Sequence, residues 1–349
     1  MTKYDGVLVR DGNDDVGEIP YKGEEMGMPC HSPDILPLQS ITSVATLISA
    51  YDKGYSGDDS VQIGQATTIY VRGKNVGTSD HSASAKLYYT LCSLMLHPKN
   101  WVKVFTGVNG EYSEDKGVDL VEMVNLNGNT TLSKEQVAVT RTPFFLLLPT
   151  PTDSSLHYCL ISEIVTKGKE VTIPKDFATA GEYIKFIIDH PGFAYRNLIT
   201  VSSSVSQMSQ TVHYGNPSKK EIYATFSIKC TNGIPKNSTV KLTPRTLLLK
   251  DEDKQKIPYK IKSKILDDDH EVNFSWKVPA SYDGMLLIEI IPPIGGSFDK
   301  GAKVNVTKSM PVLAVESGYT GNALRVLQER ENQGYVLERT VGAVTFKFT

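Results

Sequence analysis

The chain has 349 residues, of which 40% are hydrophobic and 22% charged, a composition typical of a folded protein with two or more domains. Its 37 basic and 39 acidic residues leave a formal net charge of −2, so bulk charge gives no support to binding of nucleic acid or anionic lipid. The four cysteines form no CxxC pair, and their spacing therefore argues against a zinc site.

The first residues, MTKYDGVLVRDGNDD, contain no continuous apolar segment of the kind that a secretory signal peptide requires. The longest apolar runs, Phe144–Leu148 and Met285–Ile291, are too short to span a bilayer. We therefore expect a protein that is cytoplasmic, or exported by a route that uses no signal peptide. Residues 1–31 are expected to form an irregular leader, because their glycines and prolines favour turns and extended backbone.

The clearest pattern in the sequence covers residues 67–90. Two runs of alternating β-branched and aromatic residues flank Lys74–Ser84, a segment rich in Gly, Asn, Ser and Asp. This arrangement predicts two antiparallel strands joined by a solvated loop. Residues 118–141 add weaker strand signals, and Leu156–Val165 adds a strong one. We assign residues 32–201 to a first β-sandwich of the immunoglobulin-like kind.

Residues 176–189 have the best helical periodicity in the chain. The apolar residues that recur at helical spacing are Phe177, Ala180, Ile184, Ile187 and Ile188. Asp176 is the predicted N-cap, and Pro191 with Gly192 ends the run. This amphipathic helix is expected to lie across an edge or an end of the first sandwich.

A polar, serine-rich segment at Ser202–Gln210 is expected to be a linker or a polar strand, and the boundary between the domains is expected there. Short strand-like runs separated by Pro, Gly and Asn follow, and they predict a second sandwich over residues 210–310. Residues 311–349 are expected to form a C-terminal helix and strand. The predicted fold is therefore mainly β: two immunoglobulin-like β-sandwich domains, one amphipathic helix after the first, and a short α/β C-terminal segment.

The sequence contains none of the motifs GxSxG, HExxH, GxxxxGK[ST] or GxGxxG. Ser79, Asp80 and His81 are the residue types of a hydrolase triad, but adjacent residues on a loop tend to point apart. Asp267–Asp269 offers oxygen ligands for calcium, and we favour the alternative of a solvated turn. We expect no enzyme activity, no catalytic or metal-binding residues and no cofactor.

The candidate functional residues are therefore in loops, where rigid sandwiches present recognition side chains. Asn75, Asp80 and His81 are predicted to contact a protein partner. Tyr51 and Tyr55 are predicted to stack on a sugar or a partner, with packing between strands as the alternative. A non-enzymatic interaction protein is the leading interpretation. A carbohydrate-binding module or adhesin that uses the loop aromatics is the alternative.

Four segments carry a resemblance to a known family: MTKYDGVLVRD at the start, SPDI at Ser32–Ile35, YVRGKN at Tyr70–Asn75 and HYCLI at His157–Ile161. Together they resemble bacterial proteins from gene clusters that encode α-helical pore-forming cytotoxins, of the motility-associated killing factor (Mak) type. The resemblance covers residues 1–200. It implies an accessory or co-exported component of a bacterial toxin system, with a toxin component as protein partner, and it transfers no catalytic motif.

Overall fold

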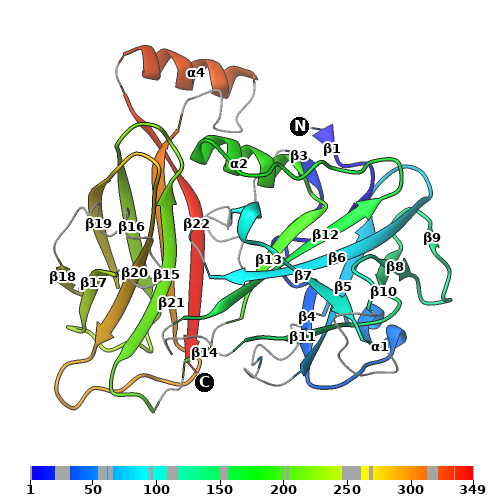
Figure 1. Ribbon diagram of the computed structural model, residues 1–349, viewed down its shortest axis with the longest axis horizontal. Coiled ribbons are helices and arrows are strands. Elements are labelled where there is room, and N and C mark those ends of the chain that lie inside the picture. Colours follow the sequence, from blue (N-terminus) through cyan, green and yellow to red (C-terminus); the bar gives the residue numbers. More distant parts are fainter. Residues whose placement is uncertain are drawn as a thin grey trace.

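The computed structural model describes residues 2–19, 32–53, 61, 66–92, 94, 97–107, 117–149, 156–198, 200–201, 204–245, 261–266, 270–312, 321–333 and 335–348. Within this part of the chain, the protein is mainly β, as predicted. Two β units lie side by side, and three α-helices and a short 3-10 helix, η1 (Pro98–Asn100), accompany them (Figure 1).

The first unit contains all the strands that precede α2. They are β1 (Thr2–Lys3), β2 (Val7–Leu8), β3 (Glu18–Ile19), β4 (Ile35–Leu38), β5 (Ala66–Asn75), β6 (His81–Leu91), β7 (Val102–Thr106), β8 (Val121–Val124), β9 (Thr131–Leu132), β10 (Val137–Thr140), β11 (Phe144–Leu147) and β12 (Tyr158–Thr166). One further strand, β13 (Phe193–Asn197), follows α2 and pairs with β12.

Strands β5 and β6 organise this unit from opposite layers. β5 pairs with β2, β4, β10 and β11, whereas β6 pairs with β7, β8, β9 and β12. The sequence predicted these two strands correctly, but the implied pairing between them is wrong, because they face each other across the core. Ile69 and Val71 of β5 and Ala85 and Leu87 of β6 are buried in the same cluster. Alternation shows which side chains are buried, but not which strand lies alongside.

The N-terminal residues belong to the first unit and do not form an irregular leader up to residue 19. Val7, Leu8 and Val9 are at most 1% exposed, and β2 pairs with β5 through Val7 and Asn75. Burial of an apolar side chain contributes about 2 kcal/mol to the free energy of folding, so these three side chains hold the segment firmly on the sandwich. The prediction of a separate leader is therefore wrong for residues 2–19.

The predicted helix is α2 (Ala180–Asp189), and it begins four residues later than expected. Thr179 is the N-cap, because its Oγ1 accepts a hydrogen bond from the Glu182 N–H at 3.1 Å. Asp176 instead lies before the helix and binds side chains of another segment. A second short helix, α1 (Val44–Ser49), was not predicted and is capped by Ser43.

Helix α2 lies where the two units meet (Figure 1). Tyr183 and Phe186 on its buried face join a cluster that contains Phe193 of the first unit and residues of β21 and β22 in the second. The helix therefore covers more than the end of the first sandwich, since its apolar face is shared by both units.

The second unit is a sandwich of two sheets. One sheet has the order β14 (Thr200–Val201), β22 (Leu337–Phe348), β21 (Lys303–Val312), β16 (Ile222–Cys230) and β19 (Glu271–Val278). The other has the order β15 (Met208–Asn216), β20 (Tyr282–Ile291), β17 (Thr239–Arg245) and β18 (Lys262–Ile265). Their inner faces bury alternate residues, as on β16, where Ala224, Phe226 and Ile228 are fully buried.

The C-terminal strand is an integral part of this sandwich. β22 pairs with β21 along its length and with β14 in parallel, and Val344, Phe346 and Phe348 are fully buried. The helix predicted before it is α4 (Gly321–Asn332). The predicted helix and strand are therefore both present, and the strand completes the second unit.

One hydrophobic cluster runs from the first unit through α2 into the second. Backbone hydrogen bonds cross the same junction: the Leu94 N–H donates to His213 O at 2.8 Å, and the His213 N–H donates to Cys92 O at 3.0 Å. The side-chain amide of Asn197 also donates to Thr345 O at 2.6 Å. A junction that is both apolar and hydrogen-bonded resembles a domain core more than a hinge.

The two tryptophans allow this shared core to be tested. Trp101 contacts Tyr88 and Phe193 in the first unit, and Trp276 is buried against Phe226 in the second. Because both belong to the same apolar cluster, we expect them to report one cooperative unfolding transition.

The measurement is urea denaturation followed by fluorescence in Trp101→Phe and Trp276→Phe, each of which retains one reporter. Circular dichroism of both variants corrects for any stability change caused by the substitution. Two separate midpoints within a single variant, one by fluorescence and one by circular dichroism, would show that the units unfold independently.

Candidate functional site

The structure places Asn75 at the end of β5, Asp80 in the connection that follows and His81 at the start of β6, but does not gather them into a contact surface. Asn75 is fully buried, and its amide donates to Ser79 O at 2.9 Å and to Leu132 O at 2.7 Å. It holds the turn between the two layers and is unavailable to a partner. Only Asp80 of the three is exposed.

His81 is held by the N-terminal segment. Its Nε2 lies 3.2 Å from Asp5 Oδ1 and 3.5 Å from Ser79 Oγ. The hydrogen bonds that Asp5 accepts from Lys169, His81 and the Thr78 N–H keep the pKa of its carboxyl well below the ordinary value. Since the acid and the serine approach the same ring nitrogen, the imidazole cannot pass a proton from one to the other, as a hydrolase triad requires.

Tyr51 is buried and cannot stack on a sugar, so the prediction for this residue is wrong. It is 4% exposed, and the guanidinium of Arg10 lies 3.6 Å from its ring centroid. Burial, together with the negative charge of Asp34, raises the pKa of its hydroxyl. Tyr55 and Asp267–Asp269 lie outside the described residues.

The ring of Tyr51 covers a buried charge cluster that the sequence did not reveal. Asp34 is fully buried and accepts hydrogen bonds from Arg10 Nε at 2.8 Å and Arg10 Nη2 at 2.7 Å. Arg72, also fully buried, has its Nε 3.4 Å from Asp34 and donates to the backbone oxygens of Pro33 and Leu47. One carboxylate therefore neutralises part of the charge of two guanidinium groups in the interior.

A second charged cluster lies where the two units meet. His97 Nδ1 lies 2.6 Å from Asp176 Oδ1, and His213 forms an ion pair with Asp283. The two imidazole rings are 6.3 Å apart and perpendicular. A small hollow of about 190 Å³ opens beside them, lined by residues of both units. Burial lowers the pKa of His97 even though Asp176 opposes this shift.

Lys308 lies behind this cluster in the core of the second sandwich. It is fully buried, it donates to Gly215 O, and the ring centroid of Tyr214 is 5.9 Å from its Nζ. Burial lowers the pKa of its ammonium to about 7, against the opposing charge of Asp283. Each histidine pairs with an aspartate of its own unit, and the two rings pack edge to face across the junction, so we assign this cluster a structural role.

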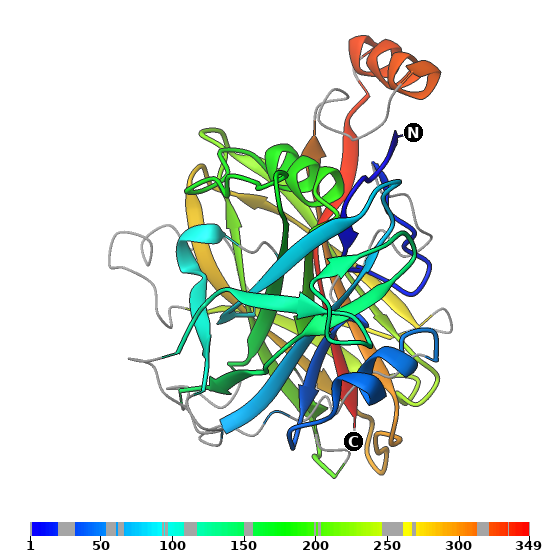
Figure 2. The same ribbon diagram turned by 90° about the vertical axis from the view of Figure 1, so that its right-hand side faces the viewer.

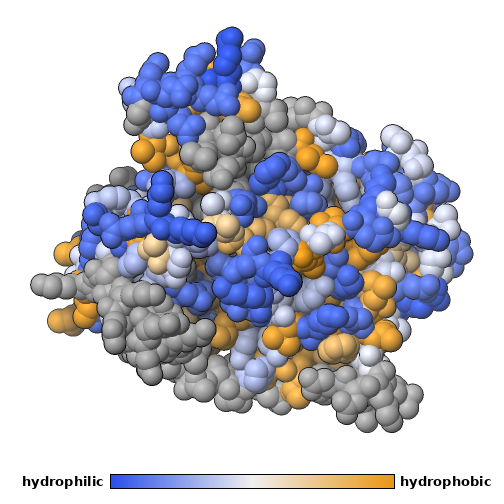
Figure 3. Space-filling view, turned by 45° about the horizontal axis from the view of Figure 1, so that its top comes forward, coloured by the Kyte–Doolittle hydropathy of each residue, from blue (hydrophilic) through white to orange (hydrophobic). Residues whose placement is uncertain are grey.

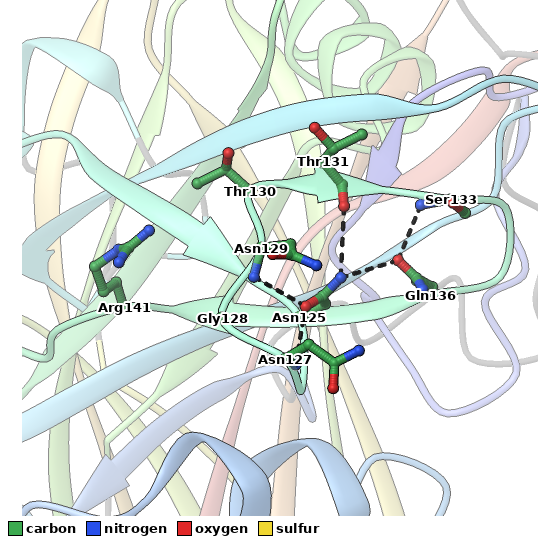
Figure 4. A pocket seen from close by; sticks show the side chains of 9 residues that line it. All are labelled: Asn125, Asn127, Gly128, Asn129, Thr130, Thr131, Ser133, Gln136 and Arg141. Atoms are coloured by element: carbon green, nitrogen blue, oxygen red, sulfur yellow. Dashed lines mark hydrogen bonds between the residues drawn. The ribbon is translucent and has the colours of Figure 1, made fainter.

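A hollow with polar walls lies on the first unit, between the β8–β9 connection and β10 (Figure 4). It encloses about 490 Å³. Asn125 shapes it, because its Oδ1 accepts hydrogen bonds from the N–H groups of Asn127 and Asn129, both at 3.0 Å. Its Nδ2 donates to Gln136 Oε1 at 3.2 Å. The loop is thus fixed internally, and the side chains of Asn127 and Asn129 remain exposed.

Helix α4 is the most prominent surface feature. It stands clear of both sheets at the end of the β21–β22 pair (Figures 1 and 2), and no other described element packs extensively against it. Its surface is mostly hydrophilic, with apolar atoms beneath it (Figure 3). Val326, Tyr335 and Val336 are 44%, 66% and 70% exposed, and Leu324 and Leu327 are half-buried. We call α4 with Tyr335 and Val336 the α4 arm.

No family model matches the chain, and no curated protein matches it. Two bacterial adhesins are among the solved structures found by fold comparison. The MSCRAMM ACE of Enterococcus faecalis, which binds its ligands by the collagen hug model, is 10% identical with a TM-score of 0.24, over 84% of this chain and 93% of that one. The CupB6 tip adhesin from Pseudomonas aeruginosa is 9% identical with a TM-score of 0.19, over 83% and 92%. Scores this low establish no relation in function.

None of the described helices combines the length and hydrophobicity needed to cross a bilayer. The described His, Cys, Asp and Glu side chains form no group of three or more arranged to hold a metal ion.

The buried charge cluster predicts a large effect of one substitution. Asp34→Asn leaves Arg10 and Arg72 buried without their counter-ion, and we expect a loss of about 3 kcal/mol or more in the free energy of unfolding. Urea denaturation at neutral pH measures the change. Asp80→Asn, at an exposed position, is the control and should change stability by less than about 0.5 kcal/mol. Equal effects of the two substitutions would show that Asp34 does not hold the cluster together.

Lys308 predicts a specific pH dependence. Its pKa is about 7 in the folded protein and close to the ordinary 10.5 when unfolded, so the unfolded chain binds more protons between these values. Stability should therefore rise with pH over this window. Removal of the amine in Lys308→Met should abolish about 3 kcal/mol of the rise between pH 7 and 9.5. Urea denaturation across this range measures it, with Lys303→Met, at an exposed position on the same strand, as the control. A wild-type slope retained in Lys308→Met would contradict the prediction.

Proposed function

We propose that this chain is a non-enzymatic interaction protein that binds a protein partner through the α4 arm. The observation that carries the proposal is the separation of α4 from the body while its apolar side chains are incompletely covered. Exposed apolar groups gathered on one projecting element are typical of an interaction site.

The length of α4 supports the same proposal. A helix of 12 residues without packing against other elements is marginal in water, because helices this short depend on burial of an apolar face. Leu324 and Leu327 supply such a face and are only half-buried, and Val326, next to Leu327, is 44% exposed. A partner with an apolar groove would cover it and stabilise the helix.

For the partner, we propose a helical component of a bacterial pore-forming toxin system of the Mak type, to which this chain would be an accessory or co-exported protein. The support is the sequence resemblance over residues 1–200. The alternative of an adhesin that uses loop aromatics loses Tyr51, which is buried.

The test places a charge on the arm. In Val326→Asp, the apolar contact is lost and a carboxylate must be desolvated on binding, so we expect at least a tenfold higher Kd for the helical toxin subunit encoded in the same gene cluster. Biolayer interferometry with the purified subunit measures Kd. Since Val326 lies outside the core, the melting temperature should stay within about 2 °C.

Asn332→Asp is the matched control, because it adds a negative charge to an exposed polar position of the same helix. An equal loss in both variants would indicate a general charge effect. Unchanged affinity in Val326→Asp would remove the α4 arm from the interface, and no binding to any subunit of the cluster would refute the toxin partner.

A further inference from the structure

The polar hollow of Figure 4 does not end at the β8–β9 connection. A second hollow of about 370 Å³ lies next to it, and Thr130 lines both. The floor of the second hollow is the outer face of β6, β8 and β12, where Ser84 pairs with Glu122 on one side and with Val165 on the other. Because Thr130 lines both, the two hollows adjoin on the first unit, and we call them together the β8 trough.

The trough arises because its floor carries short side chains and its walls carry long ones. Ser82 and Ser84 lie on the floor, and Leu120, Glu122, Val165, Lys167 and Glu170 line the second hollow around them. At the junction of the two hollows, the Arg141 N–H donates to Glu122 O at 2.9 Å, and the guanidinium lies 3.4 Å from the Glu122 carboxylate. The shape is thus built into the sheet and fixed by backbone hydrogen bonds.

The chemistry of the lining points to a polyhydroxylated ligand. The first hollow is lined by amides, hydroxyls and one guanidinium, with no apolar side chain. Amides and hydroxyls both donate and accept hydrogen bonds, as sugar hydroxyls do. The side chains of Asn127 and Asn129 are exposed in this hollow, whereas Asn125 and Gln136 are already bonded to each other and to the loop backbone.

The charges of the lining and the pairing of the floor strands restrict the chemical class of the ligand further. Two cations, Arg141 and Lys167, and two anions, Glu122 and Glu170, line the trough, so its walls are neutral overall and favour a neutral ligand. Each strand of the floor already pairs on both sides, β8 with β10 and β6, and β6 with β8 and β12. An extended peptide would therefore find no free strand edge to extend, and in the first hollow it would find no apolar pocket for a side chain.

We propose that the β8 trough is a binding site for a neutral, linear oligosaccharide several sugar units long. This site is separate from the α4 arm and uses none of the aromatic residues that the sequence suggested. Asn127 and Asn129 orient the ligand at one end by hydrogen bonds, and Ser82, Ser84 and Thr130 continue the contact across the sheet.

The test is a titration of the ¹⁵N-labelled full chain, followed by NMR, with cellohexaose, maltohexaose, mannohexaose and chitohexaose. We expect at least one hexasaccharide to shift the amide signals of residues 82–84 and 125–133 in a saturable manner at millimolar concentration or below. The double variant Asn127→Ala/Asn129→Ala should raise the Kd about tenfold, since it removes two neutral hydrogen-bonding side chains. Both backbone N–H groups that bind Asn125 are retained, so the loop should keep its shape.

Asn13→Ala is the matched control, because Asn13 is an exposed asparagine elsewhere on the first unit. The Kd of this variant for the hexasaccharide should equal that of the wild type. Absence of shifts in these residues with all four hexasaccharides at 20 mM would overturn the proposal. Binding of an oligogalacturonate, without binding of any hexasaccharide, would also overturn it, because the ligand would then be acidic. Binding of a Ser/Thr-rich dodecapeptide, without binding of any hexasaccharide, would overturn it because the ligand would be a peptide. None of these results depends on the α4 arm, whose binding is measured with Val326→Asp.

Discussion

The continuous apolar core between the two β units is the constraint on which the rest of the structure depends. Helix α2 supplies side chains to it, and main-chain hydrogen bonds between the segment after β6 and β15 cross the same junction. The β8 trough and strands β21 and β22, which carry the α4 arm between them, therefore belong to one continuous body, on different units (Figure 1). The arm itself projects from that body, so what the shared core fixes relative to the trough is the place where the arm is attached.

The buried charges explain why several short sequence motifs stand out. Arg10 lies in VLVRD, Asp34 in SPDI and Arg72 in YVRGKN, and the three side chains meet in one network. These motifs join the N-terminal segment, β4 and β5, so their role in this protein is architectural. A buried charge that loses its partner is costly, which makes such residues hard to replace singly.

Much of the fold could be predicted from the sequence, because alternating burial leaves a direct pattern on short strands. The pairing of β5 and β6 could not, since alternation carries no information about the neighbouring strand. The serine-rich segment before and at the start of β15 could not be assigned to a strand with certainty from the sequence, because the inward-facing residues Val212 and Tyr214 come after it. Two of the candidate contact residues, Asn75 and Tyr51, are buried for a related reason: they are polar or amphipathic residues used internally, and exposure cannot be read from residue type.

The parallel pairing of β14 with β22 has a consequence for how the protein folds. It pairs Thr200 with Lys347, and nearly all of the second sandwich lies between these two residues in the sequence. β14 can therefore pair with β22 only after the rest of the second sandwich has been synthesised. Contacts so distant along the chain make folding slow and leave apolar strands uncovered meanwhile. During synthesis, an almost complete second unit would still present an unoccupied sheet edge, and this nascent species is the one that a chaperone would need to shield from aggregation.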